Sequence, residues 1–131
     1  MDTLKLREVT FSAAHYLPEH PKCCVIHGHT YFVRHLLIDC EAFVDLGAIK
    51  ATIMDLDHTM IIPAEHESFW ASKQPAFEKL GIKLHLTPTE GPPTVENIKK
   101  LLKKKLSRIP GVLRVRFELF EGPNQGVTDY A

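Results

Sequence analysis

Two adjacent cysteines lie just ahead of two histidines that are one residue apart, in the stretch KCCVIHGHTY at residues 22–31. Residues two apart on an extended chain point to the same side, so His27 and His29 could bind one metal ion. His15 is the best third donor, because it ends one predicted strand and the next begins directly after His29. Three histidines with an open fourth position are the pattern of a catalytic zinc site, whereas one of the cysteines could instead close a structural site as the fourth ligand.

The same two cysteines could carry acid–base or nucleophilic chemistry. A thiol whose pKa is near neutral, beside a metal ion and a histidine, is a good general base or nucleophile. Cys23 and Cys24 point in opposite directions if the chain is extended there, so at most one should face the metal. Cys40 follows a predicted strand and is expected to pack. Three cysteines, two of them adjacent, make a poor disulfide framework, which favours free thiols.

Two further groups of ionisable side chains stand out. Asp57 and His58, in DLDHTM, could act as an orienting carboxylate and a proton acceptor if the preceding helix has ended. The alternative is that they only decorate a helix C-terminus, where a histidine favours the dipole. Glu121 continues the apolar face of a predicted strand. A buried carboxylate needs a partner, and a ligand with a guanidine-like edge could supply two parallel hydrogen bonds; a rim position or a salt bridge is the alternative.

The periodicity of the sequence predicts the elements that must position these groups. The predicted strands are 4–14, 30–38 and 112–121, with short ones at 82–86 and after GPNQG. The predicted helices are 46–57, with Asp45 as N-cap, and 95–107, with Thr94 as N-cap. A slip of the alternation near Glu8 indicates a bulge. Pro75 would break or kink a helix over 66–80, and 87–93 is expected to be a loop.

Strands grouped at the two ends, with helices between them, favour an α+β fold with an antiparallel sheet. The 131 residues fit a single domain over 1–131. With 16 basic and 16 acidic residues, there is no general electrostatic case for binding nucleic acid or an anionic membrane. No apolar run approaches the roughly 18 residues of a membrane span. The N-terminus lacks the apolar run of a signal peptide, so we expect a cytoplasmic protein.

These motifs together resemble those of the 6-pyruvoyltetrahydropterin synthase / 6-carboxytetrahydropterin synthase family. The matching stretches run in the family's order and cover most of the chain: FSAAH (11–15), CCVIHGHTY (23–31), FVDLGAIK (43–50), LDH (56–58), PTVEN (93–97) and FEG (120–122). The resemblance implies a tunnelling fold, in which a four-stranded antiparallel sheet carries helices on one face. Sheets of three subunits join into a barrel in that family, and two trimers stack as a homohexamer with active sites between subunits.

The resemblance also implies roles for individual residues. The implied zinc ligands are His15, His27 and His29. The implied catalytic groups are Cys23 and an activating pair that reaches across from another subunit, Asp57 and His58. The implied substrate-binding residues are Glu121, which anchors the pterin ring, and two residues of the pterin pocket, Thr94 and Glu96.

The implied substrate is 7,8-dihydroneopterin triphosphate, and the implied cofactor is Zn2+. Among the family's two reactions we expect the one that yields 6-carboxy-5,6,7,8-tetrahydropterin, for 7-deazaguanine synthesis leading to queuosine or archaeosine, because the chain resembles the compact microbial members. The alternatives are the 6-pyruvoyl product with release of triphosphate, a dihydroneopterin aldolase-like or cyclohydrolase activity, and a non-catalytic pterin- or metal-binding protein. An aldolase of this fold would not need zinc.

The sequence departs from the family at three points. Ile61 and Ile62 stand where Leu-Asn commonly follows the LDH motif. The segment 63–92 is longer than in compact members, and this insertion could reshape the mouth of the pocket or the oligomer. Cys24 is an extra thiol that could take over the role of Cys23.

Overall fold

The computed structural model describes residues 2–129. Its strands are β1 (Thr3–His15), β2 (His27–Cys40), β3 (Met60–Pro63), β4 (Leu86–Thr89), β5 (Val112–Glu121) and β6 (Gly126–Val127). Its helices are α1 (Leu46–Met54), the 3-10 turn η1 (Ala64–His66), α2 (Glu67–Ala71), α3 (Gln74–Glu78) and α4 (Val95–Ser107). None of the helices in this part of the chain is long and apolar enough to cross a membrane.

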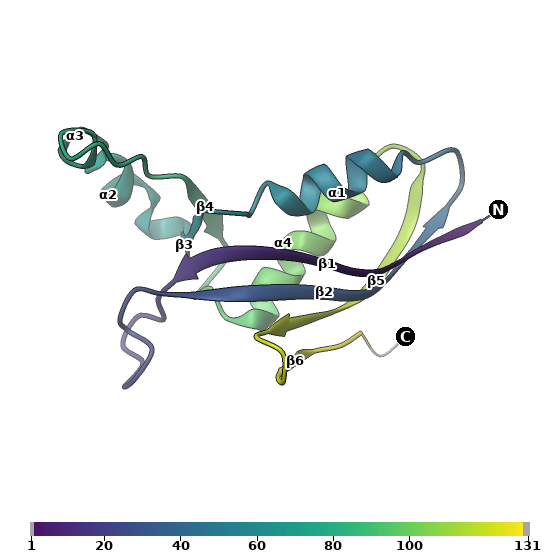
Figure 1. The fold of residues 1–131 in the computed structure, drawn as a ribbon, viewed down its shortest axis with the longest axis horizontal. Coiled ribbons are helices and arrows are strands. Elements are labelled where there is room, and N and C mark those ends of the chain that lie inside the picture. Colours follow the sequence, from purple (N-terminus) through teal and green to yellow (C-terminus); the bar gives the residue numbers. More distant parts are fainter. Residues whose placement is uncertain (1, 130–131) are drawn as a thin grey trace.

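The strands form one sheet in the order β4-β3-β1-β2-β5-β6 (Figure 1). The pairs β1–β2, β2–β5 and β5–β6 are antiparallel, as the order of the predicted elements favours. Two short strands extend this sheet in parallel: β3 pairs with the end of β1, and β4 pairs with β3. The sheet therefore has six strands rather than the four that the resemblance implies. The strand predicted over 82–86 lies instead at Leu86–Thr89, largely inside the predicted loop 87–93.

The alternation of buried and exposed residues slips near Glu8 in β1 and at the facing position in β2. Arg7 and Glu8 are both exposed, and the exposed His35 stands opposite them in β2 with a positive φ of 51°. The β1–β2 register is the same on both sides of this point, so the predicted bulge does not disturb that pair. The register shifts instead between β2 and β5, after Arg34. The irregularity thus leaves the ends of β1 and β2 aligned, which positions the residues beyond it.

Helices α1 and α4 cover one face of the sheet (Figure 1). Their apolar sides pack on alternate residues of the long strands, and the fully buried residues of this core include Tyr31, Leu36, Ile49, Ile53, Ile98 and Leu102. Both predicted N-caps form: the Asp45 side chain accepts from the Gly47 amide, and the Thr94 side chain accepts from the Asn97 amide. α1 ends at Met54, before the predicted limit of 57, because the chain turns back to the sheet there.

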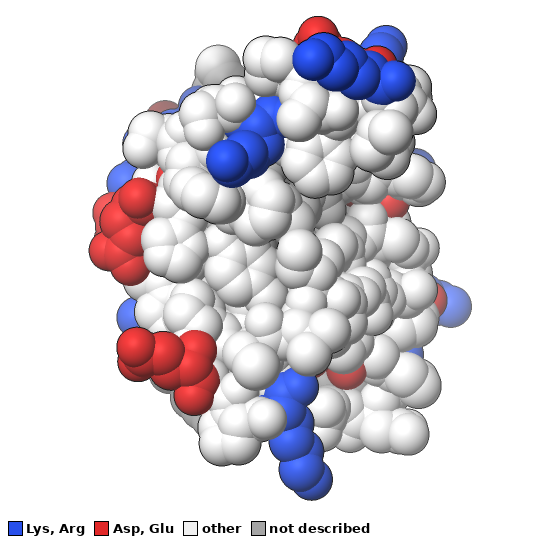
Figure 2. All heavy atoms as spheres, turned by 90° about the vertical axis from the view of Figure 1, so that its left-hand side faces the viewer, with Lys and Arg blue, Asp and Glu red and all other residues white. Residues whose placement is uncertain are grey.

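The segment 63–92 projects from one end of the sheet as η1, α2 and α3 before it returns through β4 (Figure 1). The helix considered over 66–80 is broken at Ser72 and Lys73, and Pro75 lies in the first turn of α3, where the missing N–H costs nothing. Seen from this end, Lys and Arg side chains alternate with Asp and Glu around the rim instead of forming one broad basic patch (Figure 2).

Candidate active site

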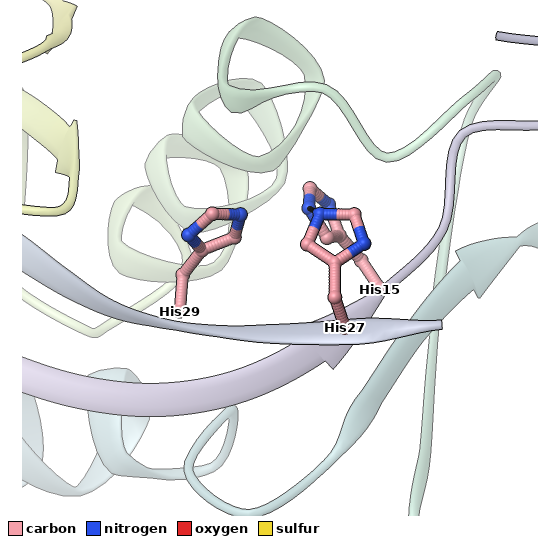
Figure 3. Close-up of side chains that lie close together, drawn as sticks. All are labelled: His15, His27 and His29. Carbon is pink, nitrogen blue, oxygen red and sulfur yellow. Dashed lines mark hydrogen bonds between the residues drawn. The ribbon is translucent and has the colours of Figure 1, made fainter. Parts of the chain in front are cut away.

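Three imidazoles converge where β1 ends and β2 begins (Figure 3). His15 pairs with His27 across the antiparallel ladder, and His29 lies two residues further along β2. Because side chains two apart share a face of a strand, all three rings project from the same side of the sheet. One nitrogen from each lies within 4.8 Å of the other two, so the group could hold a metal ion. The predicted juxtaposition of these histidines is therefore present.

Backbone carbonyls fix the tautomers of two of these rings. His15 Nδ1 lies 2.8 Å from the Pro93 carbonyl oxygen, and His27 Nδ1 lies 2.6 Å from that of Val25. A carbonyl oxygen can only accept, so both Nδ1 atoms carry the proton and both Nε2 atoms present lone pairs. These two Nε2 atoms lie 3.0 Å apart. Two lone pairs at that distance repel each other unless a cation lies between them, and tetrahedral zinc would separate such nitrogens by about 3.3 Å.

The third ring has a nitrogen without a hydrogen bond. His29 Nε2 is buried and has no hydrogen-bond partner among the described residues. Glu121 Oε1 lies 2.8 Å from it, but not in the alignment of a hydrogen bond. A buried unsatisfied nitrogen is costly unless something else occupies it. The donor set and its unmet lone pairs therefore fit a divalent metal such as zinc.

Burial tunes the electrostatics of this centre. Removal of solvent from around His15 lowers the pKa of its imidazole below the ordinary 6.5, although the Pro93 carbonyl and the Glu121 carboxylate act in the opposite direction. Burial likewise raises the pKa of Tyr31, whose ring lies against those of His15 and His29. Near neutral pH His15 is therefore uncharged, which is the form that binds a metal ion.

This pKa shift predicts an acid-sensitive fold in the metal-free protein. The unfolded chain binds a proton at His15 near pH 6.5, whereas the native state resists protonation, so the free energy of unfolding falls as the pH drops below 6.5. Urea denaturation in the presence of a chelator, at pH 7.5 and 5.5, should show a larger loss of stability for the wild type than for His15→Gln. Equal losses of unfolding free energy in the two proteins would show that His15 is not the source of the acid sensitivity.

Asp57 and His58 form the predicted pair, and they lie beyond the end of α1. His58 Nδ1 lies 2.6 Å from Asp57 Oδ2, while the Ser12 amide donates to Asp57 Oδ1 at 2.8 Å. The Ser12 bond, more than the one to His58, holds the pKa of Asp57 below its ordinary value. His58 has a positive φ of 60°, and its side chain is 82% exposed. The pair is therefore built by a turn against β1, and it presents the free nitrogen of His58 to solvent.

The two neighbouring thiols lie in the loop between β1 and β2. Cys23 is half-buried and Cys24 is exposed, and neither forms a disulfide. The Cys23 amide donates to His20 Nδ1, and its carbonyl accepts from the Leu17 amide at 2.7 Å. Among residues 2–129, neither sulfur joins the three histidines. The alternative in which a cysteine closes a four-ligand structural site is thus not realised in this arrangement.

The predicted substrate-binding residues occupy different positions. Glu121 ends β5, and its side chain is 19% exposed beside His29, on the buried face that the alternation predicts. Thr94 caps α4 directly after Pro93, which places the start of that helix beside His15. Glu96 is exposed in the first turn of α4. The structure therefore brings Glu121 and the backbone beside Thr94 to the histidines, while Glu96 faces outward.

Sequence reasoning missed the parts of the centre that have no side-chain signature. The Pro93 and Val25 carbonyls orient two imidazoles, yet any residue type offers a carbonyl. Tyr31 could have been found, because it continues the alternate face of His27 and His29.

The chain is an α+β protein whose sheet carries helices on one face. Three imidazoles converge where β1 ends and β2 begins, and a carboxylate lies beside them, so the site is a candidate catalytic metal centre. The model of the 6-pyruvoyl tetrahydropterin synthase family matches residues 5–130. The chain belongs to this family, whose members are enzymes that act on pterins.

Individual relatives agree with this assignment. A protein of Methanocaldococcus jannaschii, provisionally named a 6-carboxy-5,6,7,8-tetrahydropterin synthase, is 39% identical over 66 residues. That match spans 44% of this chain and only 40% of the relative. The 6-pyruvoyl tetrahydropterin synthase of Plasmodium falciparum superposes with a TM-score of 0.61 at 14% identity, covering 96% of this chain and 94% of its own. A catalytic-residue mutant of the Plasmodium vivax enzyme gives 0.62 at 16%, with 98% of each chain covered. At such low identity these likenesses show the fold, and they confirm the predicted tunnelling fold.

Proposed function

We propose that this chain is a zinc-dependent lyase that converts 7,8-dihydroneopterin triphosphate to 6-carboxy-5,6,7,8-tetrahydropterin, for 7-deazaguanine synthesis leading to queuosine or archaeosine. The observation that carries the proposal is the pair of Nε2 lone pairs 3.0 Å apart, next to a third unsatisfied imidazole nitrogen and a carboxylate. The name of the archaeal relative favours the 6-carboxy product. We further propose that residues 1–131 act as one cytoplasmic domain.

In this proposal His15, His27 and His29 hold the zinc ion, which would act as a Lewis acid on the hydroxyls of the substrate's side chain. Glu121 stands beside the metal centre with its carboxylate partly open to solvent. A carboxylate accepts two parallel N–H bonds, and a pterin offers such an edge at its amino group and adjacent ring nitrogen. Glu121 would therefore fix the ring so that the side chain of the substrate lies at the metal. Thr94, at the start of α4, would line the pocket around the ring, and the exposed Glu96 would join it only if its side chain turned toward the ring.

Proton transfer is assigned to Cys23 and to the Asp57–His58 pair. Cys23 lies in the loop that leads into β2, the strand that carries His27 and His29, and as a thiolate it would take a proton from a carbon of the substrate's side chain. Asp57 is fixed by the Ser12 amide and accepts from His58 Nδ1. This arrangement holds one tautomer of His58, whose Nε2 can accept or return a proton.

His58 would serve the metal centre of a second copy of the chain. Within one chain it lies at the outer edge of β1 and is exposed rather than turned toward the three histidines. β1 pairs with β3 only at Ala14 and His15, and the turn at Asp57 and His58 bonds Ser12, so in the described chain that edge of residues 3–11 pairs with no strand. An unpaired strand edge is a template for another strand. We propose that sheets of neighbouring subunits join there, as in a homohexamer built from two trimers.

The test is mass spectrometry of the products formed when zinc-loaded protein meets 7,8-dihydroneopterin triphosphate. We expect 6-carboxytetrahydropterin, with acetaldehyde and triphosphate as the other products, and no turnover after treatment with a chelator. The 6-pyruvoyl compound would instead assign the alternative reaction on the same substrate. Full activity without metal would overturn the zinc-dependent mechanism and favour an aldolase-like one.

A further inference from the structure

The segment 63–92 contributes to a cavity to which the proposed function assigns no part of the substrate. This open cavity of about 610 Å³ lies at the end of β1 and β2, where Ser12 and Thr30 contribute to its lining. Both residues alternate with the proposed metal-binding histidines along their strands, so their side chains project from the opposite face of the sheet, and His29 itself also contributes to the lining. The turn after α1 adds His58, and the approach to β4 adds Lys83 and His85. The cavity thus joins a proposed catalytic group to the insertion.

The chemistry of the lining suits an anion. Lys83 carries a full positive charge, His58 and His85 add imidazole donors, and Ser12 and Thr30 add hydroxyls. Among the described residues, no Asp or Glu lines the cavity. Asp57, which precedes His58, is already bonded to the Ser12 amide and to His58. Lysine and imidazole donors around an open space of this size match a chain of phosphate groups, which offers many acceptor oxygens and several negative charges.

We propose that Lys83 and His85 bind the triphosphate of the substrate. The inference rests on the proposed function, because it assumes that a triphosphate ester meets His58. A molecule within reach of His58 is also within reach of the cavity that His58 shares with Lys83 and His85. The reacting side chain would then lie at His58 and at the metal of the adjoining copy, while the phosphates lie along β4. The insertion would act as a phosphate clamp.

Lys83 and His85 can be replaced without disturbing the core. Lys83 and His85 are both exposed, and neither side chain is in an ion pair or hydrogen bond within the described part of the chain. Lys79, at the end of α3, is an exposed lysine of the same segment that does not line the cavity, so it provides a matched control. Loss of one charged contact to a phosphate typically weakens binding by about tenfold or more.

The first measurement is calorimetric binding of inorganic tripolyphosphate to the metal-loaded wild type and to Lys83→Ala, His85→Ala and Lys79→Ala. We expect the dissociation constant to rise about tenfold for Lys83→Ala and less for His85→Ala, with Lys79→Ala like the wild type. Equal binding by all four proteins, or no binding by the wild type, would overturn the clamp.

The second measurement separates the clamp from the proposed reaction. With 7,8-dihydroneopterin triphosphate as substrate, Lys83→Ala should raise KM and leave kcat little changed, because the contact is made in the ground state and the transition state alike. Binding of dihydroneopterin, which lacks the phosphates, should be the same in Lys83→Ala and wild type. If no product forms while tripolyphosphate binding still depends on Lys83, the proposed reaction is refuted and the anion-binding role of Lys83 is retained. If product forms and KM does not change, the clamp is wrong and the reaction stands.

Discussion

Replacement of His29 by alanine is expected to release the metal ion and abolish turnover. Two imidazoles would remain, and the loss of even an outer-shell partner of a metal ligand costs 10–100-fold in affinity, so loss of the ligand itself should cost more than about 100-fold. His29 is the best position for this test because its side chain is 26% exposed, whereas His15 is buried and bonded to Pro93. Metal content after dialysis, measured by mass spectrometry, gives the result directly.

The control is His35→Asn, which removes an exposed histidine from the same strand. Asparagine tolerates the positive φ of 51° at this position better than most residues, so the backbone should keep its course. This variant should retain the metal content of the wild type. Full metal occupancy in His29→Ala, with the fold intact by circular dichroism, would refute His29 as a ligand.

The convergence of the three histidines could be predicted from sequence because its geometry depends on local rules. Alternation along a strand places His27 and His29 on one side, and the antiparallel ladder then brings His15 directly opposite His27. Neither step needs knowledge of distant parts of the chain. The Pro93 carbonyl that orients His15 could not be predicted in the same way, because it is brought there by the packing of α4 on the sheet.

The missed strand β3 illustrates a second limit. All four residues of Met60–Pro63 are buried, so the segment has no alternation to distinguish it. Its parallel pairing with β1 requires the chain to pass over the face of the sheet through α1 first. The apolar spacing that continues from α1 to Leu56 also led the prediction past the true end of the helix. Leu56 is buried by the turn that builds the Asp57–His58 pair, rather than by another turn of helix.

Replacement of Cys23 by alanine is expected to retain zinc and lose turnover. Neither thiol of the loop joins the three histidines among the described residues, so zinc retention does not depend on Cys23. A positioned group that transfers a proton typically contributes 10²–10⁴-fold to the rate, so kcat should fall by about that factor. Steady-state kinetics with 7,8-dihydroneopterin triphosphate, together with metal analysis of the same sample, measures both effects.

Cys24→Ala is the matched comparison, because it removes the neighbouring thiol from the same loop. Cys24 is exposed, whereas Cys23 is half-buried and its amide and carbonyl are tied to His20 and Leu17, so only the Cys23 backbone is held in a fixed position. A proton must move over a short, defined path, which favours the thiol on the fixed backbone. The Cys24 variant should therefore keep turnover within about twofold of the wild type, since its thiol is assigned no part in the transition state. The opposite result, with activity kept in Cys23→Ala and lost in Cys24→Ala, would transfer the role to Cys24 and require the loop to turn its second sulfur inward when the substrate binds.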